Sequence, residues 1–183
     1  EFIASDDPRA MVRTTGDTRI NYYPTNLVIM ETDSVNPELF GGPDKQPAET
    51  PVPSLDFKLN SGYLWKNNLV MLDILATNNW ERPVYFMSTQ VPRELGLLEY
   101  MRLDGFAYRL VPYKHEPEGY ADIGSIRIDE MYDKLMNRFT WGNMNDPDVF
   151  MDYNSVRTTS VIGIRNCFSR LAEECIRQGN PEM

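Results

Sequence analysis

Two short segments of this chain hold side chains that suit ligand binding. The first is NWERPVYF at residues 79–86, and the second is GFAYRLVP at residues 105–112. In the first, Glu81 and Arg82 suit an anionic or hydroxyl-rich ligand, and Trp80 offers a flat surface on which a sugar or a base stacks. A structural role is the alternative: Trp80 fills the corner between a helix and a strand, and Arg82 caps the carbonyl groups that end the helix.

Tyr108 and Arg109 continue the candidate site on the second segment. They are adjacent in a predicted strand, so their side chains point to opposite faces of the sheet. If Arg109 points inward it needs a partner, because an isolated buried charge is very costly. The expected partner is Asp73, which interrupts an apolar helix, and we interpret such a pair as structural rather than catalytic. A concave aromatic pocket around Trp80, Tyr108 and Trp141 would favour ligand binding over a purely structural role. The full set of candidate ligand-binding residues is Trp80, Glu81, Arg82, Tyr85, Tyr108, Arg109 and Trp141.

Other kinds of site find little support in the sequence. His115 is the only histidine, and we interpret it as an exposed loop residue because no nucleophile elbow accompanies it. Metal-binding spacings of Cys and His are absent, and the acidic stretch 146–152 suits turns and helix caps better than a cation. No glycine fingerprint for phosphate is present. The sequence therefore predicts no metal and no cofactor, and it identifies no catalytic residue.

Composition and charge limit the class of protein. The chain has 183 residues, 42% of them hydrophobic, which is ample for a folded core. Its formal charge of −9 argues against nucleic acid as a partner. No apolar run reaches the roughly 18 to 20 residues that cross a bilayer, so we expect a soluble chain.

The two cysteines, Cys167 and Cys175, fall on one predicted helix. Their spacing separates them by about 12 Å along the helix axis, which is too far for a disulfide between them. Buried thiols are one interpretation, and an intermolecular bridge or a metal site is the other.

The elements that would position these side chains are clearest from residue 55 onward. Residues 1–54 are rich in loops, with β-favouring runs at 19–23 and 26–30 that suit a ribbon or an edge strand. The pattern then predicts strand 55–59, helix 66–78, strand 84–88, helix 92–103 and strand 106–111. Each connection is long enough for a crossover, so two right-handed βαβ units in a small parallel or mixed sheet are the simplest topology. The predicted class is α/β, with flanking helices.

Helices are predicted for the remainder of the chain. Apolar spacing indicates an amphipathic helix at 128–139 and a long helix at 155–178. We therefore divide the chain into a loop-rich N-terminal segment (1–54), an α/β core (55–154) and a C-terminal helical segment (155–183). Because the chain starts without Met and stops just after a helix, we interpret it as a piece of a longer protein.

These segments also carry a family resemblance. LDILATNNWERPVYF at 72–86, GFAYRLVP at 105–112, MYD at 131–133 and FTWG at 139–142 resemble the soluble part of the large protein O-mannosyltransferase-like membrane proteins of Bacteroidetes. The resemblance spans most of the chain and is strongest from residue 55 to residue 175. In that family a multi-spanning membrane core of the GT-C type precedes such a region, and tetratricopeptide-like helical repeats often follow it. The last predicted helix resembles the opening of such a tail.

The resemblance implies a location and a role. The chain would face the periplasm, where a lipid-linked sugar is transferred to hydroxyl groups of exported proteins. Its partners would be the membrane core of the same polypeptide, acceptor proteins or the lipid-linked sugar. The family's catalytic acid lies in the membrane core, so this part would be non-catalytic by itself and would either position the acceptor or brace the core. The alternatives are a protein-interaction module without a ligand, and a soluble enzyme with its site at the strand ends.

Overall fold

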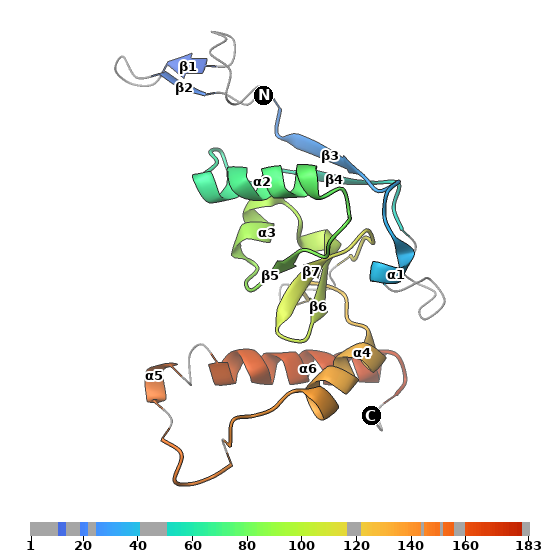
Figure 1. Cartoon of the computed structure of the whole chain (residues 1–183), viewed down its shortest axis with the longest axis vertical. Helices are drawn as coiled ribbons and strands as arrows, with labels where there is room; N and C mark the ends of the chain where they lie inside the picture. Colours follow the sequence, from blue (N-terminus) through green and yellow to red (C-terminus); the bar gives the residue numbers. More distant parts are fainter. Residues whose placement is uncertain are drawn as a thin grey trace.

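The computed structural model describes residues 11–13, 19–21, 25–40, 51–116, 122–143, 145–150, 152–155 and 160–180. Strands and helices both contribute, so the predicted α/β class is confirmed (Figure 1). The strands are β1 (Met11–Arg13), β2 (Arg19–Asn21), β3 (Leu27–Glu31), β4 (Ser54–Lys58), β5 (Tyr85–Phe86), β6 (Met101–Asp104) and β7 (Ala107–Leu110). The helices are α1 (Pro37–Phe40), α2 (Lys66–Asn78), α3 (Gln90–Leu95), the 3₁₀ helix η4 (Leu98–Tyr100), α4 (Ile128–Asp133), the π-helix η5 (Lys134–Arg138), α5 (Tyr153–Ser155) and α6 (Ile162–Arg177).

The strands form three small sheets, ordered β1–β2, β3–β4 and β5–β7–β6. All pairings between these strands are antiparallel, so the expected parallel βαβ units are wrong. The cause lies at residues 101–104, where the pattern predicts the end of a helix and the chain instead forms β6. β6 turns into β7 through Gly105 and Phe106, and a two-residue turn of this kind joins antiparallel strands. Gly105 has a φ of 71°, a backbone geometry that favours glycine.

The two β-favouring runs of the N-terminal third do not pair with each other. The first contains β2, which pairs with β1, and the second contains β3, which pairs with β4. Val28 and Met30 of β3 pack against buried residues. The second run therefore adds an edge to the predicted strand 55–59, which was one of the two expected arrangements.

Helix α2 has the predicted bounds, Lys66–Asn78. It ends there because Asn79 and Trp80 both take left-handed backbone geometry, with φ of 44° and 60°. Helix α3 is shorter than predicted, because Gly96 (φ 77°) ends it after six residues and a 3₁₀ turn follows. A β-carbon at Gly96 would lie 2.1 Å from the carbonyl oxygen of Lys58, so this helix end is tightly packed on β4.

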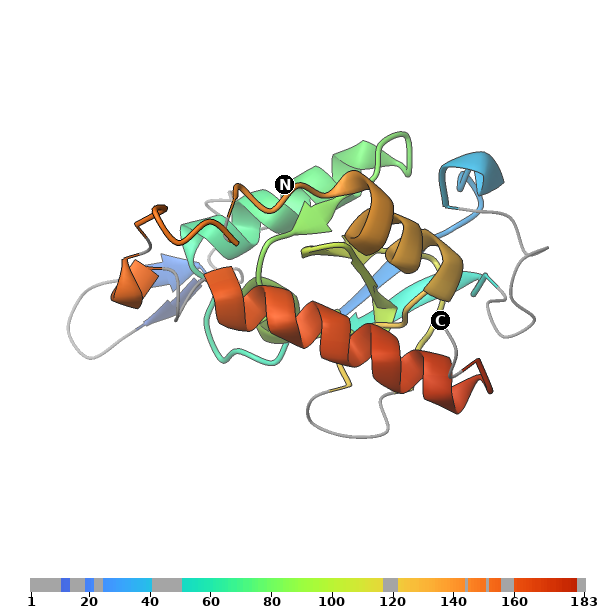
Figure 2. The same cartoon turned by 90° about the horizontal axis from the view of Figure 1, so that it is seen from below.

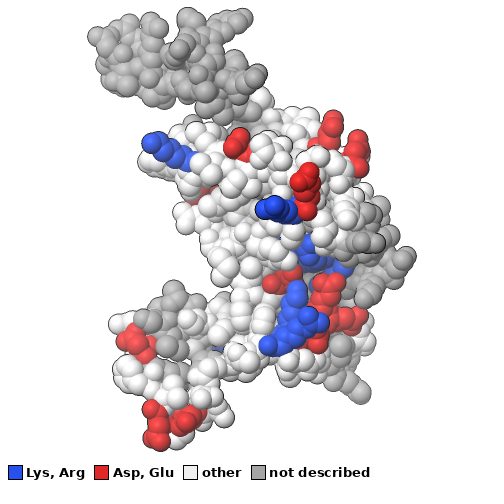
Figure 3. Space-filling view, viewed as in Figure 1, with Lys and Arg blue, Asp and Glu red and all other residues white. Residues whose placement is uncertain are grey.

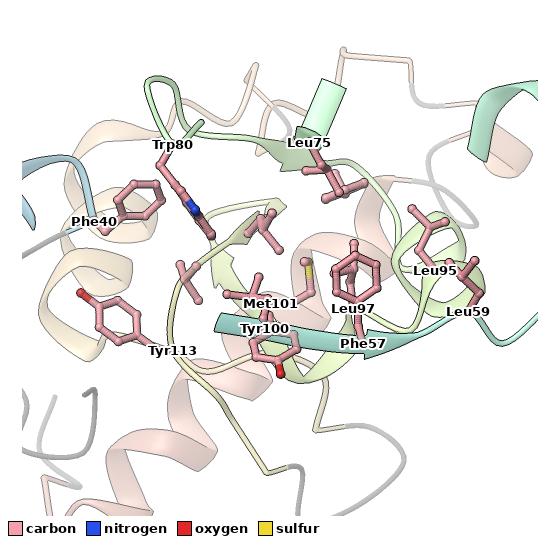
Figure 4. Close-up of a cluster of buried hydrophobic side chains, with 14 residues drawn as sticks. Phe40, Phe57, Leu59, Leu75, Trp80, Leu95, Leu97, Tyr100, Met101 and Tyr113 are labelled. Atoms are coloured by element: carbon pink, nitrogen blue, oxygen red, sulfur yellow. The ribbon is translucent and has the colours of Figure 1, made fainter. Parts of the chain in front are cut away.

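The sheet core is the larger of two clusters of buried side chains. It draws on β4, α2, α3 and the three-stranded sheet, and Figure 4 shows its packing. Its buried members include Phe40, Phe57, Leu75, Trp80, Leu95, Met101 and Leu110. This core fixes the position of the β6–β7 hairpin, which carries several of the candidate residues.

The second cluster of buried side chains holds α4, η5 and α6 together. We call these three helices the C-terminal lobe. Its buried members include Leu103, Ile126, Met131, Leu135, Cys167, Leu171 and Cys175. Figure 2 shows α6 running across the underside of the sheet with α4 beside it. Cys167 and Cys175 are buried and free, which confirms the interpretation as buried thiols. None of the described helices is both long and apolar enough to cross a lipid bilayer.

Candidate functional site

Trp80 lies in the sheet core and not on the surface. It is only 4% exposed, and its indole Nε1 donates a hydrogen bond of 2.8 Å to the carbonyl of Glu31. Its ring packs edge-to-face on Phe40 with centroids 5.4 Å apart, as Figure 4 shows. A stacking surface for a sugar or a base needs an open ring face. Trp80 therefore has the structural role that was its alternative interpretation.

Glu81 and Arg82 are exposed at the same corner. Two hydrogen bonds of Asn78 close the corner. Its side-chain amide donates a hydrogen bond of 2.8 Å to the main-chain carbonyl of Arg82. Its main-chain carbonyl accepts a hydrogen bond of 2.9 Å from the N–H of Glu81. The main-chain N–H of Glu81 thus caps a carbonyl at the end of α2, which is the role that was expected of the Arg82 side chain. The cavity beside Arg82 has a volume of 10 Å³, which is room for about one water molecule. The corner offers charge but no space for a ligand.

Arg109 is buried, and its partner is not the expected one. Its guanidinium donates a hydrogen bond to the carbonyl of Leu39 and lies 4.8 Å from the ring centre of Phe40 and 5.6 Å from that of Tyr85. Asp73 is exposed on α2, so the expected Arg109–Asp73 pair is wrong. Arg109 faces α1 instead, where two ring faces and a main-chain carbonyl take the place of a carboxylate.

Tyr85 and Arg109 are cross-strand neighbours on β5 and β7, so the structure brings these two candidate residues together. The Tyr85 hydroxyl donates 3.1 Å to the carboxylate of Asp104, which also accepts from the ammonium of Lys134. Burial raises the pKa of Tyr85, which therefore remains a donor at neutral pH. Burial opposes the ionisation of Asp104, but the hydrogen bond and charge of Lys134 outweigh it and lower the pKa of this carboxyl. Asp104 is therefore ionised and satisfied within the protein.

Arg102, which sequence analysis missed, extends these contacts to α4. It lies opposite Arg109 in the β6–β7 pairing and is only 1% exposed. Its guanidinium donates a hydrogen bond of 3.3 Å to the carbonyl of Phe40 and lies 3.9 Å from the carboxylate of Glu130. Glu130 also pairs with Arg127 at 2.9 Å. Burial opposes the ionisation of Glu130, but these two arginines outweigh it and lower the pKa of the carboxyl. Figure 3 shows basic and acidic side chains gathered where the sheet meets the C-terminal lobe. Because its charges are paired internally, we interpret this network as structural.

A groove of 810 Å³ lies between α6 and the sheet core, and we call it the α6 groove. One wall is α6, and the other is formed by the connection from β5 into α3 and by the β6–β7 hairpin. Ligand pockets occupy about 300 to 1,000 Å³, so the volume suits a ligand. Figure 3 shows the surface hollowed between the core and the part of the lobe where α6 begins. Tyr108 is the member of the candidate set that lines the α6 groove.

Tyr108 and Cys167 are the titratable groups of the α6 groove whose pKa values are shifted. Burial raises the pKa of both, and the positive charge of Arg170 offsets part of the effect in each case. Both groups are therefore protonated at neutral pH, and a protonated thiol is a poor nucleophile. They offer packing and neutral hydrogen bonding, not acid–base chemistry.

Arg170 anchors α6 beside the groove. Its guanidinium donates three hydrogen bonds: one of 2.8 Å to the carboxylate of Asp122, one of 2.9 Å to the carbonyl of Ile123 and one of 2.8 Å to the carbonyl of Gly124. The other carboxylate oxygen of Asp122 lies 3.2 Å from the Nε2 of His115. His115 is half-buried and paired, so the expectation of an exposed histidine is wrong: Asp122 draws the ring into this contact.

Most of the α6 groove was missed from the sequence, although one signal for it exists. Gly163, Asn166 and Ser169 follow one another at intervals of three residues, which places small and polar side chains next to one another on the surface of α6. The sequence does not say what faces them, because the opposite wall comes from segments that are distant along the chain.

Trp141 lies in an aromatic cluster of the C-terminal lobe. Its ring centre is 6.0 Å from that of Phe106, 6.4 Å from that of Phe139 and 5.6 Å from that of Phe168. Trp80 belongs to the sheet core, so Trp80 and Trp141 do not share a concave pocket.

Within the described part of the acidic stretch, Pro147 and Asp148 lie in a turn, as the composition suggests. The Asp148 N–H donates 2.9 Å to the carboxylate of Asp146. Within the part of the chain that the structure describes, no group of three His, Cys, Asp or Glu side chains is placed to hold a metal ion.

Comparison with known proteins identifies one family. The family described as TMEM260-associated domain 2 matches residues 1–130, which is more than half of the chain. The matched region includes the whole β5–β7–β6 sheet, and α6 lies beyond it. No curated protein and no solved structure matches the chain.

Proposed function

The chain belongs to the family of TMEM260-associated domain 2, and from this premise we propose that it is a non-catalytic domain linked to a glycosyltransferase-like membrane protein. We further propose that it holds one substrate of the transfer reaction in the α6 groove. The observation that carries this binding role is the groove itself, which has the volume of a ligand site and a mixed polar and apolar lining.

The proposed location is the periplasmic face of the membrane, with the membrane core of the same polypeptide as the domain's partner. The resemblance of segments 72–86 and 105–112 to the protein O-mannosyltransferase-like membrane proteins of Bacteroidetes supports this assignment. In the same arrangement, α6 would be the first helix of a tetratricopeptide-like tail.

The chemistry of the groove supports a binding role over a catalytic one. Transfer of a sugar to a hydroxyl needs a group that accepts the hydroxyl proton. Glu173 is the one carboxylate among the described lining residues, and it is exposed to water. Tyr108 and Cys167 are held in their protonated forms. The catalytic groups would therefore lie in the membrane core.

A titration of the 183-residue chain tests the binding role. The ligands are mannose and short mannosides, soluble analogues of a polyprenyl-phosphate headgroup, and Ser/Thr-rich peptides, with amide NMR shifts as the readout. Saturable shifts at Tyr108, Gly163 and Ile164 with any one class support the proposal. If no class gives saturable shifts there, the domain does not hold a substrate and its role is to brace the membrane core.

A further inference from the structure

We infer that the substrate held in the α6 groove is an extended polypeptide segment of the acceptor, and not the sugar or its lipid phosphate. This inference rests on the proposed function and makes it more specific. It follows from the length of the groove, from the groups that line it and from the way its two arginines and its aromatic rings are already engaged.

The length of the groove suits an extended chain. Its lining residues on α6 run from Gly163 to Glu173, a span of about 15 Å at 1.5 Å per residue. An extended polypeptide advances about 3.3 Å per residue, so the groove would hold roughly four or five residues. A single hexose would fill only a small part of this length.

The lining also matches a polypeptide backbone, which presents a donor and an acceptor at nearly every residue. Thr89, Asn166 and Ser169 supply neutral hydroxyl and amide groups that both donate and accept, and they are interspersed with apolar side chains such as Ile164. Neutral side chains of this kind bind main-chain groups without demanding one sequence. That property suits a domain that serves more than one acceptor.

The glycine on the groove wall leaves room for the bound chain. A β-carbon at Gly163 would meet no other atom within 4 Å, so the backbone of α6 is open at this point. Glycine weakens a helix interior by roughly 1 kcal/mol relative to alanine, so its presence here has a cost to the helix. Close approach of another backbone is a reason for glycine in such a place.

The described lining of the groove offers a phosphate two arginines, Arg93 and Arg170, and both are already engaged. The guanidinium of Arg170 already donates to the Asp122 carboxylate and to the carbonyls of Ile123 and Gly124. Arg93 is engaged in an interaction of its own. Glu173 adds a negative charge to the same lining, which opposes the binding of an anion.

The aromatic rings of the described lining, Phe106 and Tyr108, are both partly covered by protein. Phe106 is stacked on Phe139 with ring centres 4.7 Å apart and planes at 25°, and Trp141 meets it edge-on. Tyr108, the other aromatic residue of the described lining, is half-buried. Carbohydrate recognition by aromatic side chains needs an open ring face, and Phe139 already covers one face of Phe106.

The test uses fluorescently labelled Ser/Thr-rich peptides of about six to eight residues, which are long enough to span the groove, and follows their anisotropy with the 183-residue chain. Gly163→Trp fills the groove, and the matched control Ile162→Trp adds the same side chain one position away, on a residue outside the groove lining. The expected result is peptide binding that Gly163→Trp weakens at least about tenfold, or 1.4 kcal/mol, and that Ile162→Trp leaves unchanged. Ser169→Trp is a second blocking variant, and circular dichroism verifies that each variant is folded.

A second readout uses the two cysteines of the chain. Cys167 lines the α6 groove and Cys175 does not. Bound peptide is expected to slow thiol labelling of Cys167 while the labelling rate of Cys175 stays the same. Binding of mannosides or phosphate analogues to the groove, with no binding of peptide, would overturn this inference and leave the proposed function standing. Absence of binding by all three classes would overturn both.

Discussion

Arg170 of α6 and Asp122 are joined by an ion pair of 2.8 Å that fastens the C-terminal lobe to the sheet core. Two further hydrogen bonds from the same guanidinium, to the carbonyls of Ile123 and Gly124, strengthen this attachment. The segment that contains Gly124 is in turn held to β6, because the Ser125 N–H donates a hydrogen bond to the Met101 carbonyl at 3.0 Å. Arg170 therefore helps to fix the position of one wall of the α6 groove.

Replacing Arg170 with methionine should destabilise the protein by roughly 2 to 4 kcal/mol, because it leaves a partly buried carboxylate and two carbonyls without their donor. Urea unfolding measures the change. Arg165→Met is the control, since Arg165 lies on the same helix and is exposed. Equal stability of the two variants would show that Arg170 does not anchor α6.

Truncating Trp80 should cost far more than truncating the exposed Trp65. Trp80→Ala removes a ring that is 4% exposed together with its hydrogen bond to Glu31, for an expected loss of roughly 3 to 5 kcal/mol. Trp65 is 62% exposed, so Trp65→Ala should stay within about 1 kcal/mol. Thermal or urea unfolding of both variants provides the measurement. A small loss for Trp80→Ala would return this residue to the list of binding candidates.

Acid should weaken the contact between the sheet and the C-terminal lobe. The pKa values of Asp104 and Glu130 are lowered in the folded state, against about 3.9 and 4.3 in an unfolded chain. Their stabilisation is therefore complete above the unfolded pKa and is lost as the pH falls through the folded pKa, because the unfolded state then binds more protons. Unfolding free energies measured from pH 7 to pH 3 should fall most steeply below about pH 4.

The variant Asp104→Asn tests that assignment. It should lower stability at pH 7 and flatten the decline in acid, since one of the two titrating groups is gone. Asp73→Asn is the matched control, because Asp73 is exposed on α2. If Asp104→Asn and the parent protein show the same pH profile, Asp104 does not contribute to it.

Local sequence patterns predicted the elements whose signals are contained within them. Helix α2 has the predicted bounds because its apolar spacing is helical and Asn79 takes the left-handed geometry that asparagine tolerates. The alternation in Leu55 and Phe57 likewise predicted β4, where both side chains are buried.

Strand direction and the candidate site depend on contacts that spacing does not encode. Met101 and Leu103 alternate in a way that suits a strand, yet the same residues continue a helical pattern, and pairing with β7 decides between the two. Arg109 donates through its Nη2 to the carbonyl of Leu39, a main-chain group that any residue type at that position would supply. The α6 groove exists only because α6 returns to the sheet, so no single segment predicted it.

Gly96 should be among the least replaceable residues of the chain. Its φ of 77° strains any other L-residue, and a β-carbon there would lie 2.1 Å from the Lys58 carbonyl oxygen, which belongs to the backbone of β4 and cannot move independently. Gly96→Ala should therefore lower the free energy of unfolding by at least roughly 3 kcal/mol, the sum of backbone strain and steric overlap. At Gly62 a β-carbon would meet nothing within 4 Å, so Gly62→Ala, measured in the same urea titration, should change stability by less than about 1 kcal/mol. Similar values for the two variants would mean that α3 does not pack against β4 as described, and the groove wall that α3 helps to position would have to be placed anew.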